Sequence, residues 1–250
     1  MIHSISSRAE LEQANAALGG TLPFDDDLSP LREPLVLGSH TAPNRIAYQA
    51  MEGCDGTPEG APGELTIRRY HRFAHGGPGV IWFEATAVRR EGRANPRQMF
   101  LDEHTLDAFA RLADEIREIS MRENGYAPLI FMQLTHSGRY SKPDGVPAPL
   151  IAYNNPIFEQ DHPIPADRIL SDDDLDRVRE SLIHSATLAE KAGFDGADIK
   201  CCHRYLLCEL LSAYERPGKY GGSFENRTRL VREAMRGARA ACGKNFMVSS

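Results

Sequence analysis

Residues 79–88 form a nearly continuous apolar run, Gly-Val-Ile-Trp-Phe-Glu-Ala-Thr-Ala-Val. Such a run is typical of a strand in a parallel sheet, because these strands are buried on both faces. Similar segments recur along the chain, separated by stretches with apolar residues at three- and four-residue spacing, which predict amphipathic helices. The predicted strands lie at residues 44–51, 79–88, 128–134, 194–199 and 246–249, and the predicted helices at residues 64–74, 105–122, 171–193 and 224–241. This alternation predicts a parallel α/β fold.

The number of strands limits the architecture. A closed (β/α)8 TIM barrel needs eight parallel strands, whereas this chain of 250 residues supplies five, with four helical connections. Five parallel strands leave two unpaired edges. We therefore expect either the first five strands and four helices of a (β/α)8 TIM barrel, in a fragment of a longer protein, or an open sheet. We expect this barrel domain at residues 34–250, and we expect it to be incomplete at its C-terminal end. Residues 1–33 are polar and predict an N-terminal extension over one end of the barrel, with a short helix within residues 7–18.

The composition excludes several classes of partner. A formal net charge of -6 and a pI near 5.9 provide no basic surface for nucleic acid or anionic lipid. No apolar run reaches the roughly 18 residues of a membrane span, and the first residues lack a secretory signal. The five cysteines are too few for a disulfide scaffold, and the adjacent Cys201 and Cys202 would point to opposite faces of a strand, which argues against a metal site. We expect structural thiols in a cytoplasmic protein.

Polar side chains concentrate just after the strand at 194–199. Lys200, His203 and Tyr205 follow it in the pattern K-x-x-H-x-Y, and Gln133 ends the preceding strand. Active sites of α/β barrels lie at the C-terminal ends of the strands. Any one of these residues alone is more often a packing or capping residue, so the prediction of a site rests on their combination.

Other features allow a plain interpretation beside a functional one. Glu84 lies inside a buried strand and needs a partner or a role; an ion pair with an arginine is the simpler interpretation. His71 and His75 have a spacing that metal sites use, but a solvent-facing pair is favoured. Residues 140–168 form a long loop without periodicity, and such a loop often serves as a lid or substrate wall.

Six groups of residues carry a resemblance to a known family, in order and spacing from about residue 34 to the end. They are Asn44-Arg45-Ile46 with Met51, Glu84-Ala-Thr-Ala-Val with Glu91-Gly-Arg, Gln133-Leu-Thr-His136-Ser-Gly-Arg139, Gly193-Phe-Asp-Gly, Lys200-x-x-His203-x-Tyr205 and Tyr220-Gly-Gly-Ser-x-Glu-Asn-Arg227. With these motifs the chain resembles the old yellow enzyme family of NADH:flavin oxidoreductases. Its nearest relatives look like the 2,4-dienoyl-CoA reductase and 2-enoate reductase branch.

The resemblance implies an FMN-binding barrel in which NAD(P)H reduces the flavin and hydride passes from flavin N5 to an activated alkene. It places Ala50, Met51 and Glu52 beside the flavin ring. It also places Gln133 on the pyrimidine edge of the flavin, where a primary amide offers a donor and acceptors. Lys200 and His203 would bind the substrate carbonyl oxygen, where two donors stabilise a developing enolate. Tyr205 would donate a proton to the α-carbon.

We thus expect an FMN-dependent ene-reductase that acts on an α,β-unsaturated carbonyl, acid or thioester. The sequence also permits a homo-oligomer. A flavin-dependent amine dehydrogenase or N-demethylase on the same barrel, and a catalytically silent truncated fragment, are the alternatives. An iron–sulfur cluster and FAD, known in related long-chain reductases, would lie in a region absent from this chain. Three residues depart from the family pattern: Glu52 replaces a small polar residue or thiol, Lys200 an aromatic or imidazole donor, and Arg204 a glycine.

Overall fold

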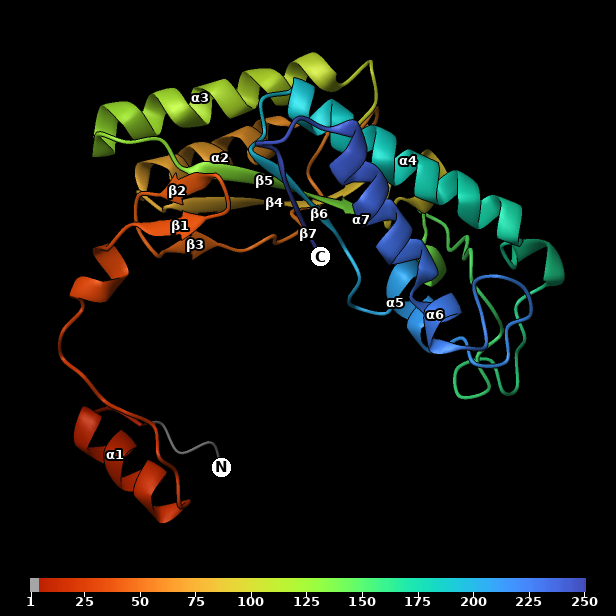
Figure 1. Cartoon of the computed structure of the whole chain (residues 1–250), viewed down its shortest axis with the longest axis horizontal. Helices are drawn as coiled ribbons and strands as arrows, with labels where there is room; N and C mark the ends of the chain where they lie inside the picture. The colour runs from red at the N-terminus through yellow and green to blue at the C-terminus, as the bar shows by residue number, and fades with distance from the viewer. Residues whose placement is uncertain (1–4) are drawn as a thin grey trace.

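The strands form a hairpin and a five-stranded parallel sheet in a computed structural model that describes residues 5–250. The hairpin pairs β1 (Leu35–Leu37) with β2 (His40–Ala42). The sheet has the order β3-β4-β5-β6-β7 (Figure 1). Its strands are β3 (Ala47–Tyr48), β4 (Val80–Ala87), β5 (Leu129–Thr135), β6 (Gly196–Ile199) and β7 (Met247–Ser249). The predicted number of strands and their parallel pairing are confirmed.

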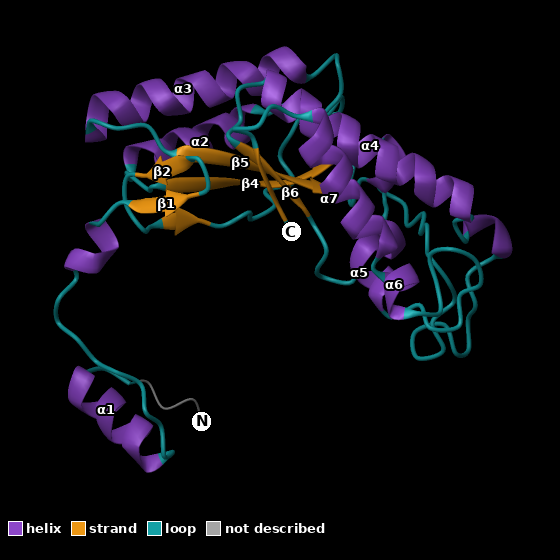
Figure 2. Ribbon diagram, viewed as in Figure 1, coloured by secondary structure: helices purple, strands orange, loops and turns teal. Residues whose placement is uncertain are grey.

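Four helices connect consecutive strands of the sheet. They are α2 (Glu64–His75), α3 (Leu106–Asn124), α4 (Asp172–Lys191) and α7 (Arg229–Ala241). Parallel crossovers are right-handed, so a strictly sequential strand order places every helix on the same face of the sheet. The helices do lie together on one side of the strands (Figure 2). This one-sided arrangement is that of a TIM barrel and not of a doubly wound sheet, whose helices cover both faces.

The helix-facing side of the sheet holds the main core. Ile81 and Phe83 of β4 and Ile130 and Met132 of β5 are fully buried there against the helices. Phe83 also stacks on Tyr70 of α2, with ring centroids 4.0 Å apart. Full burial of an apolar side chain of this size contributes about 1.5–3 kcal/mol each, so this layer holds helices and strands together.

The opposite side of the sheet is apolar at one end and polar at the other. Trp82 of β4 pairs in register with Phe131 of β5, so the two side chains lie on the same side, and alternation along β5 places Gln133 there as well. Trp82 stacks on Phe131 at 4.6 Å, within a small apolar cluster that the hairpin helps to cover. The polar residues follow toward the C-terminal ends of the strands, where barrel active sites lie.

The capping signals of α4 agree with the structure. Ser171 accepts a hydrogen bond from the backbone of Asp174, whose carboxylate accepts one from the Ser171 backbone. This reciprocal capping box satisfies donors that the first turn leaves without partners. The C-terminal end of a different helix, α3, is set by Gly125, which adopts φ 79°, a left-handed conformation that suits glycine and ends the helix.

Two predicted boundaries are wrong for local reasons, and one short helix was missed. The strand expected at 44–51 is reduced to β3, because the Asn44 side chain accepts a bond from Ile46 N at 3.0 Å and holds the backbone in a turn. The helix expected at 224–241 is broken into α6 (Phe224–Arg227) and α7, and the Thr228 hydroxyl at the junction donates back to Phe224 O at 2.8 Å. A short helix, α5 (Leu206–Leu211), was not predicted.

The N-terminal helix α1 (Arg8–Ala17) forms as expected but contains no buried residue. Figure 1 shows it standing clear of the sheet. The expectation that the extension lies over one end of the barrel stays a prediction, since this chain contains only part of a barrel. Among residues 5–250, no helix combines the length and hydropathy needed to span a bilayer.

The cysteines are all free, but only Cys242 is buried. Cys54 and Cys202 are exposed, so the burial expected of structural thiols does not hold for them. Within the described part of the chain, no three or more His, Cys, Asp or Glu side chains form a group that could hold a metal ion.

Candidate active site

Glu52 joins two of the predicted site residues in one cluster. Its Oε1 accepts hydrogen bonds from Lys200 Nζ at 3.1 Å and from Tyr205 Oη at 3.2 Å. The Lys200 ammonium also lies 4.4 Å from the centroid of the Tyr205 ring. The loop after β3 and the segment after β6 thus converge at the C-terminal side of the sheet.

The end of β6 positions Lys200. Its backbone N donates to Leu134 O at 3.0 Å and so continues the ladder between β5 and β6 by one residue. Strand alternation then places Lys200 on the same face as Asp198. With only 4% of its surface exposed, Lys200 is a buried cation that requires a partner such as Glu52.

Tyr205 is held at the start of α5. It is the N-cap residue of that helix, and its backbone N donates to Cys202 O at 3.2 Å. Burial, followed by the charge of Glu52, raises the pKa of the Tyr205 phenol well above its usual range. The phenol therefore stays protonated throughout the physiological pH range.

Gln133 belongs to a second polar group on the same face. Its Nε2 donates to Asp198 Oδ2 at 2.8 Å, and the indole Nε1 of Trp82 donates to the same oxygen at 3.2 Å. Two donors thus satisfy a carboxylate that is 8% exposed. Asp198 precedes Lys200 by two residues on β6, so the second group adjoins the cluster.

The other predicted site residues lie around the cluster without bonding to it. His203 is exposed, with its ring centroid 6.5 Å from that of Tyr205, and its contact among hydrogen-bonding atoms is Cys202 Sγ at 3.6 Å. Ala50 is half-buried and Met51 is 72% exposed on the loop that leads to Glu52. Their roles at a flavin or a substrate stay predictions.

Glu84 holds the loop that carries Glu52. Its Oε2 accepts a hydrogen bond from the backbone N of Gly53 at 2.7 Å. Its Oε1 pairs with Arg69 of α2 at 2.5 Å, and Arg69 also pairs with Asp55 in the same loop. The arginine ion pair expected from the sequence is confirmed, and it supports the loop beside the candidate site.

His136 contributes packing at the turn after β5. The ring is 1% exposed, and its Nδ1 accepts a hydrogen bond from Gly138 N at 3.1 Å. Burial lowers the pKa of His136 to about 4, so the imidazole is neutral at pH 7. Gly92 provides the space, because a Cβ there would lie 2.6 Å from the imidazole Cδ2.

Aromatic and cationic side chains also lie near Tyr205. The Tyr140 ring lies 5.9 Å from the Tyr205 ring, and the Arg204 guanidinium carbon lies 5.9 Å from the Tyr140 centroid and 4.8 Å from that of Phe158. The sequence did not identify Tyr140 or Phe158 as site residues. Tyr140 directly follows the His136-Ser-Gly-Arg139 motif, and that adjacency was the available signal.

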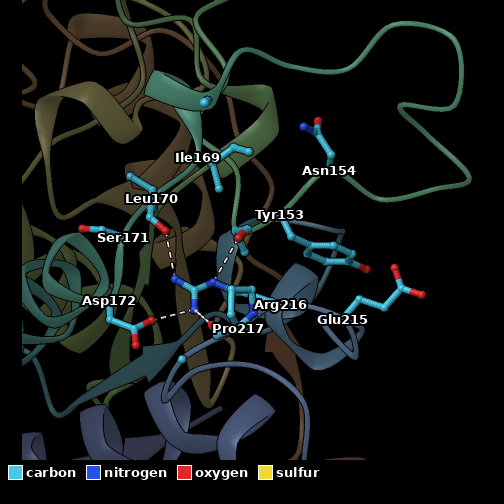
Figure 3. Close-up of a pocket in the computed structure, with 12 residues that line it drawn as sticks. Tyr153, Asn154, Ile169, Leu170, Ser171, Asp172, Glu215, Arg216 and Pro217 are labelled. Atoms are coloured by element: carbon cyan, nitrogen blue, oxygen red, sulfur yellow. Dashed lines mark hydrogen bonds and ion pairs between the residues drawn. The ribbon is translucent and has the colours of Figure 1, made fainter.

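A cavity of about 670 Å³ lies elsewhere, between the 140–170 loop and the segment before Tyr220. Its floor is Arg216, whose guanidinium donates to Ala152 O, Leu170 O and Asp172 (Figure 3). The arginine is 7% exposed and saturated by these internal contacts. None of the predicted site residues lines this cavity, so it is separate from the Glu52, Lys200 and Tyr205 cluster.

Comparison with known proteins identifies the family of this chain and agrees with its fold. Residues 30–250 match the family model described as NADH:flavin oxidoreductase / NADH oxidase. The chain belongs to this family. An NADPH dehydrogenase of Bacillus pumilus is 32% identical over 212 residues, which cover 82% of this chain and 58% of that protein. An NADH-dependent flavin oxidoreductase of Aspergillus parasiticus is 30% identical over 227 residues, covering 83% and 49%.

The fold comparison agrees with the partial barrel. The old yellow enzyme of a Pichia species superposes with a TM-score of 0.72 at 22% identity and covers 88% of this chain and 58% of its own. The predicted TIM-barrel class is confirmed for the part of the fold that this chain contains. The chain spans about half to three-fifths of the length of the curated relatives that it matches.

The family implies FMN as cofactor and NAD(P)H as reductant. The polar residues on the sheet face fit the flavin ring chemically. Gln133 is half-buried, and its Oε1 accepts no hydrogen bond within residues 5–250, which leaves an acceptor for a ring N–H. An ionised Glu52 would oppose an anionic reduced flavin, but its ion pair with Lys200 compensates that charge locally.

Proposed function

We propose that this chain is the part of an FMN-dependent oxidoreductase, of the ene-reductase type, that carries the proton donor. Residues 34–250 form the FMN-binding barrel domain in this proposal, and residues 1–33 an extension. The convergence of Glu52 and Lys200 on Tyr205 is the observation that supports it. When bound, the flavin would supply hydride, taken from NAD(P)H, to the β-carbon of an alkene conjugated with a carbonyl group.

Tyr205 holds the proton that the α-carbon needs. Its raised pKa keeps the phenol neutral, and its proton lies in a hydrogen bond to Glu52 in the absence of substrate. Donation to carbon would leave a phenolate. The Lys200 ammonium, 4.4 Å from the ring centroid, lies where it stabilises that negative charge.

Lys200 and His203 are the candidates for the substrate carbonyl oxygen. Two donors that meet a developing enolate oxygen stabilise the transition state more than the ground state. His203 is exposed and within 6.5 Å of the Tyr205 ring centroid, so its imidazole is accessible to a substrate beside the phenol. Lys200 would share its donors between Glu52 and the substrate, since an ammonium has three.

The charges near Tyr205 disfavour the amine dehydrogenase alternative. An enzyme that takes a cationic amine would use open aromatic faces to hold it. Here Lys200 already lies over the Tyr205 ring, and Arg204 lies over the rings of Tyr140 and Phe158. These cations would repel a second cation, so a neutral or anionic substrate is favoured.

The experiment separates the two half-reactions. The purified chain is incubated with FMN, and bound flavin is measured by its absorption band; a chain that stays colourless contradicts the proposal. Anaerobic reduction by NAD(P)H and reoxidation by an enone are then followed by stopped flow. Tyr205→Phe should slow reoxidation by about 10²- to 10⁴-fold while reduction stays near wild type. Equal losses in both half-reactions would remove Tyr205 from the role of proton donor.

A further inference from the structure

Arg204 sits in a backbone conformation that side chains with a Cβ rarely adopt. Its φ is 55°, and that of its neighbour His203 is 59°. Left-handed conformations of non-glycine residues cost free energy and concentrate at functional sites. The family pattern has glycine at position 204, which would adopt this turn without strain. The arginine side chain is therefore present despite its backbone cost.

The Arg204 guanidinium is held in place but carries no counter-charge. It lies over the rings of Phe158 at 4.8 Å and Tyr140 at 5.9 Å. Within residues 5–250 it makes no ion pair, and the residue is exposed. Stacking restricts the side chain before any ligand arrives, so its planar fork of donors is pre-organised for an oxyanion.

Two cations near Arg204 are compensated by carboxylates. Arg139 also stacks on Phe158, at 5.1 Å, but it pairs with both Glu159 and Glu209. Lys200 pairs with Glu52. Arg204 is thus the cation beside Tyr205 for which the described residues supply no carboxylate, and its uncompensated charge faces solvent.

The position of Arg204 relative to Tyr205 limits where a bound anion would lie on the substrate. Its guanidinium lies 5.9 Å from the Tyr140 ring, which in turn lies 5.9 Å from the Tyr205 ring, and within residues 5–250 Arg204 makes no cation–π contact with Tyr205 itself. An anion bound by Arg204 would therefore lie apart from the carbon that Tyr205 protonates. We propose that Arg204 binds a carboxylate carried by the substrate several bonds away from its C=C–C=O unit, and so selects anionic alkenes. This inference rests on the proposed function for the identity of the reacting group.

A matched pair of ligands tests the inference. 4-Carboxybenzylideneacetone is an enone with a carboxylate across a benzene ring, and its methyl ester has the same skeleton without the charge. Binding of each to the full chain with FMN added is measured by calorimetry and by quenching of Trp82, the single tryptophan. Arg204→Gly suits the observed φ, so its effect is not a failure to fold. Arg72→Ala is the control, at an exposed helical arginine that makes no ion pair with any residue from 5 to 250.

The expected result is a loss of about tenfold or more in affinity for the carboxylate in Arg204→Gly, with the ester within twofold, as for a charge-assisted bidentate contact. Salt should weaken carboxylate binding by the wild type and leave binding by the glycine variant nearly unchanged. Arg72→Ala should bind both ligands like wild type. Equal losses for carboxylate and ester, or no loss for either, would overturn the inference and assign Arg204 to packing against Phe158.

The same measurements separate this inference from the proposed function. Turnover of the ester by the FMN-loaded chain tests the reaction independently of Arg204. A charge-selective loss of binding in a chain that reduces neither ligand would leave Arg204 as an anion site and contradict the proposed reaction. Reduction of both ligands with no dependence on Arg204 would keep the reaction and remove the anion site.

Discussion

The ammonium of Lys200 lies 3.1 Å from the carboxylate of Glu52, and both residues depart from the old yellow enzyme pattern. That pattern has uncharged side chains at position 52 and an aromatic or imidazole donor at position 200. In this chain the two departures compensate each other in charge. Both residues also contact Tyr205, because Glu52 accepts a hydrogen bond from its hydroxyl and Lys200 lies over its ring. The candidate site is therefore a charge-balanced variant of the family arrangement.

Replacing one or the other residue of this pair should lower the free energy of unfolding by unequal amounts. Glu52→Gln leaves the buried Lys200 ammonium without a carboxylate and should lower the free energy of unfolding by about 3 kcal/mol. Lys200→Met should cost less, because Glu52 is 19% exposed and keeps its bond from Tyr205. The double variant should recover part of the loss, with a coupling energy above about 1 kcal/mol. Urea unfolding measures all three, and strictly additive losses would contradict a direct pair.

Arg69 is predicted to stabilise the loop that carries Glu52. Arg69→Met would leave Glu84, which is 2% exposed, as a buried carboxylate without its cation. We expect a loss of about 3–5 kcal/mol. Arg68→Met, at an exposed arginine one residue earlier on α2, is the matched control and should change stability by less than about 0.5 kcal/mol. Similar losses in the two variants would argue against the ion pair.

We predict that burial of His136 makes the free energy of unfolding depend on pH in the acid range. Its folded pKa of about 4 lies below the ordinary 6.5, so the unfolded chain binds the proton more tightly. The contribution is complete above pH 6.5 and is lost as the pH falls from 6.5 to 4, by about 3 kcal/mol in all. His136→Asn keeps an acceptor for Gly138 N and should flatten the curve in that window. Parallel curves for both proteins, from urea unfolding at several pH values, would contradict the buried neutral imidazole.

Gly92 is predicted to be required for the packing of His136. A Cβ at position 92 would lie 2.6 Å from the imidazole Cδ2 and 2.8 Å from its Cγ. Gly92→Ala should therefore lower the free energy of unfolding by about 1–3 kcal/mol, as overpacking of a core does. Adding His136→Ala removes the clash, so the double variant should lose less than the sum of the single losses. If thermal unfolding shows that the loss in the double variant equals the sum of the two single losses, the strain lies elsewhere.

Local patterns in the sequence were enough to predict the main elements. Buried strands and amphipathic helices differ in the spacing of their apolar residues, and residues 79–88 and 105–122 show those spacings plainly. The capping signal at Ser171 is equally local. The motifs around Gln133 and Tyr220 identified the family, because their residues and spacing occur together. Boundaries were less well predicted where one side chain redirects the backbone, as at Asn44 and Thr228.

By itself the sequence determined the α/β class, the order of strands and helices, the family and the K-x-x-H-x-Y candidates, since each depends on neighbouring residues. Only the tertiary structure decided which residues meet. Glu52 and Lys200 are 148 positions apart, and their contact depends on how the loop after β3 folds over the end of β6. The spacing of apolar residues along the sequence does not predict how that loop folds. The same holds for Arg204, whose stacking on Phe158 depends on where the 140–168 loop returns to the sheet.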